Sequence, residues 1–342
     1  MIIKTNYNFI KINSLFIGIV LWSAIAHSQV ANYSDITDFN EYSEVHWVNQ
    51  IPPLNQGEKL HKKGWLKRLI LGKDDLTNLQ KPVMAIRLKN LTTVILDQGL
   101  GTVFLSKDDI IEVPKIFKKQ ENLFSSLIGA CNFQDNKLLI TDSGSNKIFQ
   151  LTDDFKLLNE LNKELSLKQP TGIAYSKINN EIWVVETGEH RIVILDLLGN
   201  VKRILGNRGF AAGEFNYPTS IWIDSKGTAY IVDALNYRVQ LFDKEGNFIS
   251  MFGENGNGTG YFASPKGIAT DSYGHIYVVD ALFHTVQIFD QKGNYLYHFG
   301  NQGRQSGEFW MPSGIFIDEN NIIYVADSYN SRIQLFELDF KK

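Results

Sequence analysis

The chain has 342 residues, of which 44% are hydrophobic, enough for a large core in one domain. Its formal charge is −3, which argues against the clustered basic surface that nucleic-acid binding needs. A single cysteine excludes an intramolecular disulfide, so a hydrophobic core must supply the stability.

Residues 1–26 are predicted to be a signal peptide. Lys4 and Lys11 form a basic start, Leu15–Ala26 is apolar, and Ala24-Ile-Ala26 gives a small-residue cleavage pattern. The apolar run is shorter than the about 20 residues of a spanning helix, although an uncleaved anchor is the alternative. We expect an exported protein, periplasmic or extracellular, with no transmembrane segment after cleavage. Its charge would be about −5, because the signal removes two lysines and no acidic residue.

Residues 27–64 contain no repeat, and Ile51-Pro-Pro-Leu54 interrupts regular structure, so we expect an extended N-terminal arm there. Residues 65–342 are predicted to form the main domain. Its first segment, residues 65–71, is similar to residues 200–205, which read as the last strand of a repeat. We predict that residues 65–71 supply the outer strand of the last repeat, because the C-terminus has no room for it.

A period of 47 residues dominates the second half of the chain. Asp233, Asp280 and Asp327 each end a strand-like run, and nearby glycines and prolines recur at the same step. Each period holds four short strand-like runs separated by Gly, Asn and Asp turns, which is typical of a propeller blade. Extended towards the N-terminus, the acidic column has six members: Asp97, Asp142, Glu186, Asp233, Asp280 and Asp327. The sequence therefore predicts an all-β, six-bladed β-propeller with four-stranded antiparallel blades, closed into a ring by an N-terminal strand.

These repeats resemble the NHL-repeat family. Its pattern couples Pro-x-Gly-Ile-Ala, Tyr-Val-x-Asp, Asn-x-Arg and Ile/Val-Gln-x-Phe. The chain has Pro265–Ala269, Tyr277–Asp280 and Asp327–Phe336 in these places, and the resemblance extends from Gln169 to the C-terminus. It implies a six-bladed propeller. For function it implies a protein-binding or RNA-binding module or, in one enzyme type, a peptide-amidating lyase.

The pairs Asp233/Arg238 and Asp327/Arg332 repeat an acid–arginine unit. We interpret this unit as a lock on the turn between the second and third strands, because ligand sites are usually local departures from a repeat.

The turns after the second strands and the long loops after the fourth strands fall on one face of a propeller, the loop-rich face. Aromatic, arginine and asparagine side chains there favour partner binding. The candidate binding residues are Arg191, Tyr217, Asn236, Tyr237, Arg238, His284, Trp310, Tyr329, Asn330 and Arg332.

No catalytic residue, metal ligand or cofactor is predicted. His190 and His284 share a repeat position, but zinc needs three or four converging ligands. The lyase resemblance would place zinc-binding histidines directly after the proline that opens each first strand. This chain has other residues there: Thr171, Thr219, Lys266 and Ser313. The first strands also lack the carboxylates with which six-bladed lactonases bind calcium.

The expected function is a non-catalytic, monomeric binding module for a protein, peptide or glycan, and not for nucleic acid. The alternative is a metal-dependent lyase or lactonase-type enzyme that uses the mouth of the central channel, with calcium or zinc bound there. A stoichiometric metal in the purified protein would distinguish the alternative.

Overall fold

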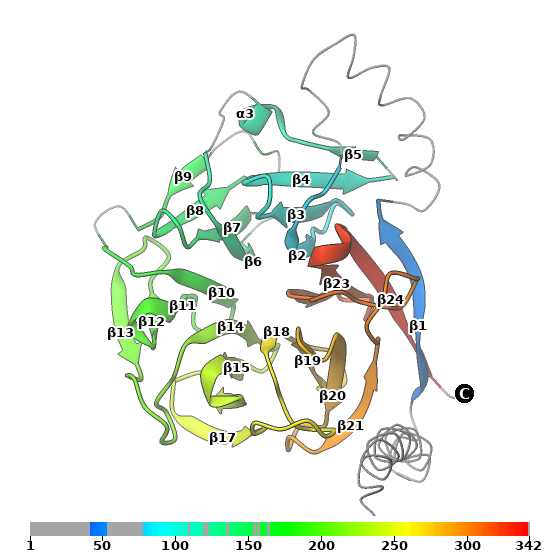
Figure 1. Ribbon diagram of the computed structural model, residues 1–342. Helices are drawn as coiled ribbons and strands as arrows, with labels where there is room; N and C mark the ends of the chain where they lie inside the picture. The colour runs from blue at the N-terminus through cyan, green and yellow to red at the C-terminus, as the bar shows by residue number, and fades with distance from the viewer. Residues whose placement is uncertain are drawn as a thin grey trace, which may run out of the picture. The chain divides into compact units, whose positions relative to one another are not determined.

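The computed structural model describes residues 42–52, 78–108, 110–118, 123–134, 137–152, 155, 158–162 and 165–340. The propeller occupies the compact unit Glu44–Asp339. Six four-stranded sheets follow one another around a central axis (Figure 1), which confirms the predicted fold class. The predicted signal peptide lies outside the described residues. Among those described, no helix is long and apolar enough to cross a membrane.

The strands of each blade are called a to d from the axis outwards. Blade 1 is β2 (Pro82–Arg87), β3 (Thr93–Asp97), β4 (Thr102–Lys107) and β5 (Ile110–Glu112); blade 2 is β6 (Leu127–Phe133), β7 (Lys137–Asp142), β8 (Lys147–Leu151) and β9 (Leu158–Glu160); blade 3 is β10 (Pro170–Ser176), β11 (Glu181–Glu186), β12 (Arg191–Leu195) and β13 (Val201–Leu205). Blade 4 is β14 (Pro218–Ile223), β15 (Ala229–Asp233), β16 (Arg238–Phe242) and β17 (Phe248–Phe252); blade 5 is β18 (Pro265–Thr270), β19 (Ile276–Asp280), β20 (Thr285–Phe289) and β21 (Tyr295–Phe299); blade 6 is β22 (Ile315–Ile317), β23 (Ile323–Asp327), β24 (Arg332–Phe340) and β1 (Tyr42–Ile51). Short helices are α3 (Lys115–Lys118), η1 (Thr187–Glu189), η2 (Ala234–Asn236) and η3 (Ser328–Asn330).

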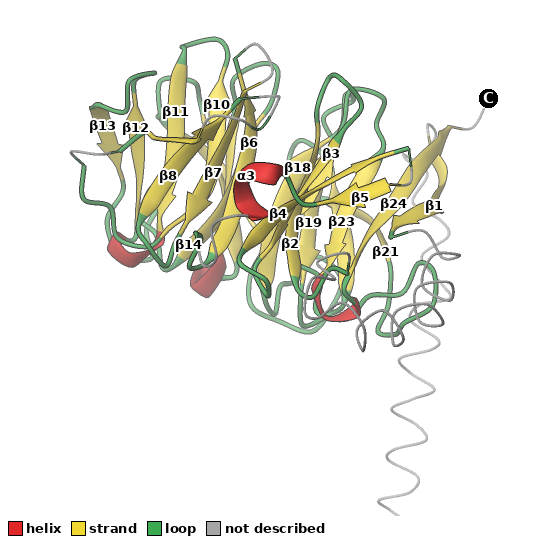
Figure 2. Cartoon of the chain, turned by 90° about the horizontal axis from the view of Figure 1, so that it is seen from above, coloured by secondary structure: helices red, strands yellow, loops and turns green. Residues whose placement is uncertain are grey.

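The core lies between neighbouring blades. Every residue of β15, β19 and β23 is buried, because these strands have a blade on each side. Their near-continuous apolar sequence follows from burial on both faces. In contrast, β17 alternates between exposed and half-buried residues at the rim of the ring. Seen from the side, the strands run between two loop-covered faces (Figure 2).

An N-terminal strand completes blade 6, but it is not the predicted one. Strand β1, which pairs with β24, lies within the region predicted to be an extended arm. Residues 65–71, predicted to fill this place, lie outside the described residues. The prediction was wrong because an outer strand is half exposed, so its pattern is weakly specific. A buried polar contact also links β1 to β24: Arg332 Nη1 donates a hydrogen bond to Gln50 Oε1 at 3.1 Å.

Glycines let the innermost strands of adjacent blades approach closely. A Cβ at Gly172 would lie 2.8 Å from the backbone nitrogen of Ile221 in the next blade, and a Cβ at Gly267 would lie 2.5 Å from the Ser313 carbonyl oxygen. Side chains therefore do not fit at these positions. The glycine of the Pro-x-Gly pattern is explained by packing around the axis.

We predict that Gly267→Ala lowers the free energy of unfolding by about 1–3 kcal/mol, the usual cost of overpacking. Gly258→Ala is the matched control, because its added Cβ meets a Tyr261 ring atom at 3.3 Å rather than fixed backbone. Urea unfolding with an unchanged m-value would measure both. Equal midpoints for the two variants would contradict this account of the repeat glycine.

Candidate functional site

A buried carboxylate fixes each turn of the loop-rich face. All six members of the acidic column are fully buried. In blade 6, Asp327 accepts hydrogen bonds from the Trp310 backbone N–H at 2.7 Å, Asn330 Nδ2 at 2.9 Å and Arg332 Nε at 2.7 Å. Desolvation raises the pKa of Asp327 although these donors lower it, which shows how far the carboxylate is removed from water.

Arg238 and Arg332 are buried, not on the surface where we predicted them. The remaining nitrogens of Arg238 donate to backbone carbonyls of the preceding d–a loop: Phe210 at 2.7 Å, Ala211 at 2.9 Å and Glu214 at 2.9 Å. Arg332 binds the equivalent loop through Gln305 and Glu308. The loop folds over the turn and covers the guanidinium group, so neither arginine is available to a partner.

The side chains of Asn236 and Asn330 also form hydrogen bonds within the protein. The side-chain amide of Asn236 donates to the Gly209 carbonyl at 2.9 Å, and that of Asn330 donates to the Gly303 carbonyl at 2.8 Å. Each amide also donates to the carboxylate of its own blade. The two asparagines thus hold d–a loops in place.

The paired histidines join adjacent blades. His190 Nδ1 accepts the backbone N–H of Tyr217 at 3.0 Å, and His284 Nδ1 accepts that of Met311 at 3.0 Å. In blade 2, Asn146 Oδ1 occupies the same repeat position and accepts the Gln169 N–H at 2.8 Å. Burial is the main cause that lowers the pKa of both histidines. Each ring is therefore a neutral acceptor in a clasp between blades.

The remaining predicted binding residues differ in their exposure to solvent. Arg191 is half-buried and donates to Glu186 at 2.6 Å, and half-buried Tyr237 caps η2 in the left-handed conformation. Trp310 is half-buried with the Arg304 guanidinium 5.0 Å from its ring centroid. Tyr217 and Tyr329 are exposed. These two tyrosines are the predicted residues that present the most surface to a partner.

Two exposed leucines extend this surface, and the sequence analysis missed them. Leu235, Leu282 and Tyr329 occupy one repeat position on blades 4, 5 and 6, with 49%, 55% and 60% of each residue exposed. Blades 1 to 3 have glycine at this position: Gly99, Gly144 and Gly188. A comparison of the six blades at this repeat position would have found the leucines, because an exposed turn does not require a large apolar residue.

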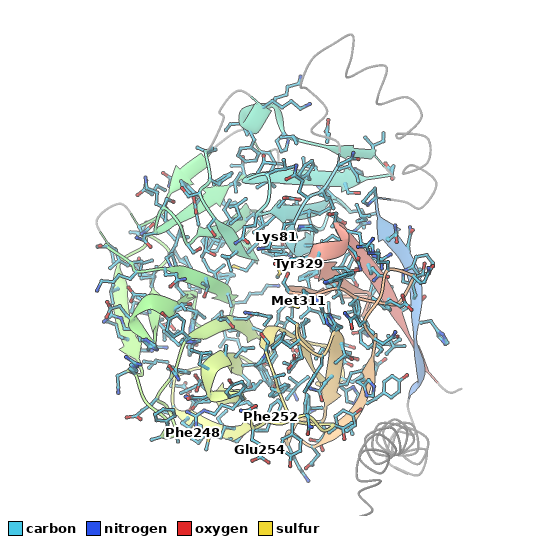
Figure 3. The ribbon with its side chains drawn as sticks, viewed as in Figure 1. Lys81, Phe248, Phe252, Glu254, Met311 and Tyr329 are labelled. Carbon is cyan, nitrogen blue, oxygen red and sulfur yellow. The ribbon has the colours of Figure 1, made fainter. Side chains whose placement is uncertain are left out.

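A cavity of about 320 Å³ lies inside the ring at the loop-rich face, lined by first-strand residues of blades 1 to 5 and by the segment just before β22 in blade 6. Lys81, Tyr329 and Met311, which line it, lie near the centre of the ring in Figure 3. Trp222 of blade 4 reaches across the channel: its Nε1 donates to Thr270 Oγ1 of blade 5, and its ring lies edge-on to Phe316 of blade 6 with centroids 6.0 Å apart. Trp222 thus links blades 4, 5 and 6.

The polar side chains that line the cavity carry hydroxyls, an amide and two ammonium groups: Thr219, Ser220, Ser313, Ser328, Tyr329, Gln98, Lys81 and Lys266. The described lining has no imidazole, thiol or carboxylate, the side-chain groups that zinc and calcium sites are mainly built from. Across the described ranges, no three His, Cys, Asp or Glu side chains lie where they could hold a metal ion.

Comparison with known proteins supports the fold. A family described as a 6-bladed β-propeller matches residues 225–282 and 269–342. No curated protein matches the sequence. The structure is similar to an auxiliary nutrient binding protein from Bacteroides thetaiotaomicron, with 17% identity, a TM-score of 0.62 and coverage of 78% of this chain and 71% of that one.

Two enzymes have the same fold. Virginiamycin B lyase from Staphylococcus aureus is 15% identical, with a TM-score of 0.56 and coverage of 76% of this chain and 97% of that one. A gluconolactonase from Xanthomonas campestris is 14% identical, with a TM-score of 0.59 and coverage of 77% and 87%. At these identities the likeness concerns the fold alone, and both binding proteins and enzymes use it. The NHL resemblance stays a prediction.

We predict that Arg238→Ala lowers the free energy of unfolding by about 3–5 kcal/mol, because it leaves the buried Asp233 carboxylate without its cation. Arg304→Ala, which removes an exposed arginine from the same kind of loop, should change stability by less than about 1 kcal/mol. Chemical denaturation measures both. A small effect at Arg238 would show that the buried network is not what holds the loop.

The histidine clasps predict a pH dependence. A lowered folded-state pKa means that the unfolded chain binds more protons, so stability falls as the pH drops below about 7 and through the unfolded histidine pKa of about 6.5. His284→Asn should reduce this fall while keeping the clasp, as Asn146 does in blade 2. Thermal melts from pH 8 to pH 5 test it. Identical pH profiles for variant and wild type would contradict the assigned role.

Proposed function

We propose that this chain is an exported, non-catalytic binding module that takes a protein, peptide or glycan ligand on its loop-rich face. The observation that carries the proposal is the exposed apolar column Leu235, Leu282 and Tyr329. Isolated exposed apolar residues are ordinary. Three of them at one repeat position on consecutive blades, beside a cavity, make a surface that folding does not require.

Further exposed aromatic residues belong to the same face. Phe210, on the d–a loop that enters blade 4, is 76% exposed, and Tyr217 at the end of that loop is 42% exposed. Aromatic side chains supply much of the binding energy at protein interfaces. Both lie on the loop that Arg238 holds through the Phe210 carbonyl.

The surface is rigid before a ligand arrives. The turn that carries Tyr329 is η3, and Asp327 and Asn330 tie it to the neighbouring d–a loop. Rigid binding residues lose less conformational entropy on association. The likeness in fold to nutrient-binding proteins of Bacteroides further supports a binding role.

A pull-down from the native cell envelope tests the proposal. The variant Leu235→Ser/Leu282→Ser/Tyr329→Ser should recover at least about tenfold less partner than wild type, as expected when interface hot spots are removed. The matched control is Ile178→Ser/Leu198→Ser, which replaces exposed apolar residues on turns of the opposite face. Its recovery should equal that of wild type.

Two outcomes would count against the proposal. Equal recovery by all three proteins would show that the apolar column binds nothing. A stoichiometric, tightly bound metal in the purified protein would favour the lyase or lactonase-type alternative.

A further inference from the structure

Blades 3 and 6 each contain a pair of hydroxyl groups near the axis of the ring. The post-proline position is the residue that directly follows the proline opening strand a. In blade 3, Thr171 Oγ1 at this position lies 2.7 Å from Thr187 Oγ1, which donates to the Pro218 carbonyl of the next blade at 2.6 Å. In blade 6, Ser313 Oγ lies 2.7 Å from Ser328 Oγ, which donates to the Pro82 carbonyl of blade 1 at 2.7 Å. These hydroxyl pairs connect one blade to the next.

Blades 1 and 2 lack this hydroxyl pair, and so do blades 4 and 5, where Ala234 and Ala281 stand at the second position. In blade 4, the Thr219 hydroxyl is buried and finds no partner among the described residues. A buried hydroxyl without a partner is unfavourable. In blade 5, the post-proline residue is Lys266, which is exposed to the water of the cavity. Within the described part of the chain, no hydrogen bond or ion pair is formed by its ammonium group, so this group is available to a ligand.

Lys266 lies in an electrostatically unusual place. Its side chain can be reached by water, but the cavity walls replace much of its hydration, and this burial is the main cause that lowers its pKa. Asp280 raises that pKa, and Lys81 lowers it to a smaller extent. The Asp280 carboxylate also accepts the backbone N–H groups of Ala263 and Ser264.

Lys81 brings a second cation to the same cavity. Its Nζ lies 5.8 Å from the centroid of the Tyr329 ring (Figure 3). The aromatic face provides a weak attraction for this cation and no negative charge. The cavity is therefore lined by two ammonium groups and an exposed tyrosine, and the buried Thr219 hydroxyl lies in its wall.

We propose that this cavity binds the anionic oxygen group, carboxylate or phosphate, of a ligand whose apolar body rests on Leu235, Leu282 and Tyr329. Lys81 and Lys266 supply charge-assisted hydrogen bonds. The cavity volume of about 320 Å³ suits the charged group and a few carbon atoms, so the remainder of the ligand lies on the loop-rich face. The inference rests on the proposed binding function and specifies which chemical group is recognised.

Calorimetric titration with paired probes tests the charge requirement. The peptide N-acetyl-Ala-Ala-Leu with a free carboxylate is compared with its C-terminal amide, and octanoate is compared with octanamide. Octyl phosphate is the third anion. We expect the anions to bind at least about tenfold more tightly than the amides, the size of one hydrogen bond to a charged group. Binding of the peptide acid alone identifies a peptide C-terminus, whereas binding of octanoate or octyl phosphate identifies a small amphipathic anion.

Variants assign the binding to the cavity. Lys266→Ser/Ala281→Ser gives blade 5 the hydroxyl pair that blade 6 has. The variant thus removes the charge and puts a contact that the fold already uses in its place. It should lose about tenfold or more in anion affinity, and Lys266→Arg should retain most of it. The control Lys226→Met removes an exposed lysine from an a–b turn on the opposite face and should bind as wild type. The affinity of the wild-type protein for the anion should also decline as the pH rises. Because the pKa of Lys266 is lowered, the decline should begin at a lower pH than for an ordinary lysine, whose pKa is about 10.4.

The inference is overturned if no anion binds, if the amides bind as tightly as the acids, or if Lys266→Ser/Ala281→Ser binds like wild type. Failure of anion binding can be distinguished from failure of the proposed binding function. If the envelope partner is still captured through Leu235, Leu282 and Tyr329, the face binds a ligand without using the cavity. If capture fails as well, the binding function itself is wrong.

Discussion

The loop-rich face depends on the carboxylate that each blade buries at the end of its second strand. Removal of a charge from water is costly, so this group must be surrounded by donors. Asp327 accepts hydrogen bonds from the Trp310 N–H of the d–a loop, from the Asn330 amide of the b–c turn and from the Arg332 guanidinium of strand c. The carboxylate thus joins these three segments. The carboxylate therefore determines where the d–a loop lies and how the b–c turn points. The same requirement removes the arginines from the surface.

A regular ring of this kind does not by itself recognise anything. Each blade presents nearly the same turn, and most of its polar groups are consumed by neighbouring blades. Specificity can arise where the repeat is broken. Here blades 4 to 6 carry the exposed column Leu235, Leu282 and Tyr329, and blade 5 has Lys266 where blades 3, 4 and 6 have a hydroxyl residue. Tyr329 and Lys266 both line the cavity.

Close packing holds together the strands around this cavity. Glycines such as Gly172 and Gly267 let the innermost strands approach one another, and Trp222 joins blades 4, 5 and 6. A preformed site of this kind lowers the entropic cost of binding. Lys266 is partly desolvated in the cavity, which strengthens its attraction for an anion relative to a lysine on an open surface.

The sequence by itself determined the architecture, because a blade cannot bury its faces alone, so the 47-residue period indicates a ring and the six acidic positions give the number of blades. It also indicated that an N-terminal strand closes the ring. Only the tertiary structure decided which strand does so, since the half-exposed pattern of β1 differs little from that of other segments and its place is set by pairing with β24. Likewise, the sequence found the positions of Arg238, Asn236 and His284, but their roles depend on loops that fold over them from the neighbouring repeat. The cavity lysines became visible only when residues 185 positions apart in the chain were brought to one mouth, because proximity around a ring is not encoded by local pattern.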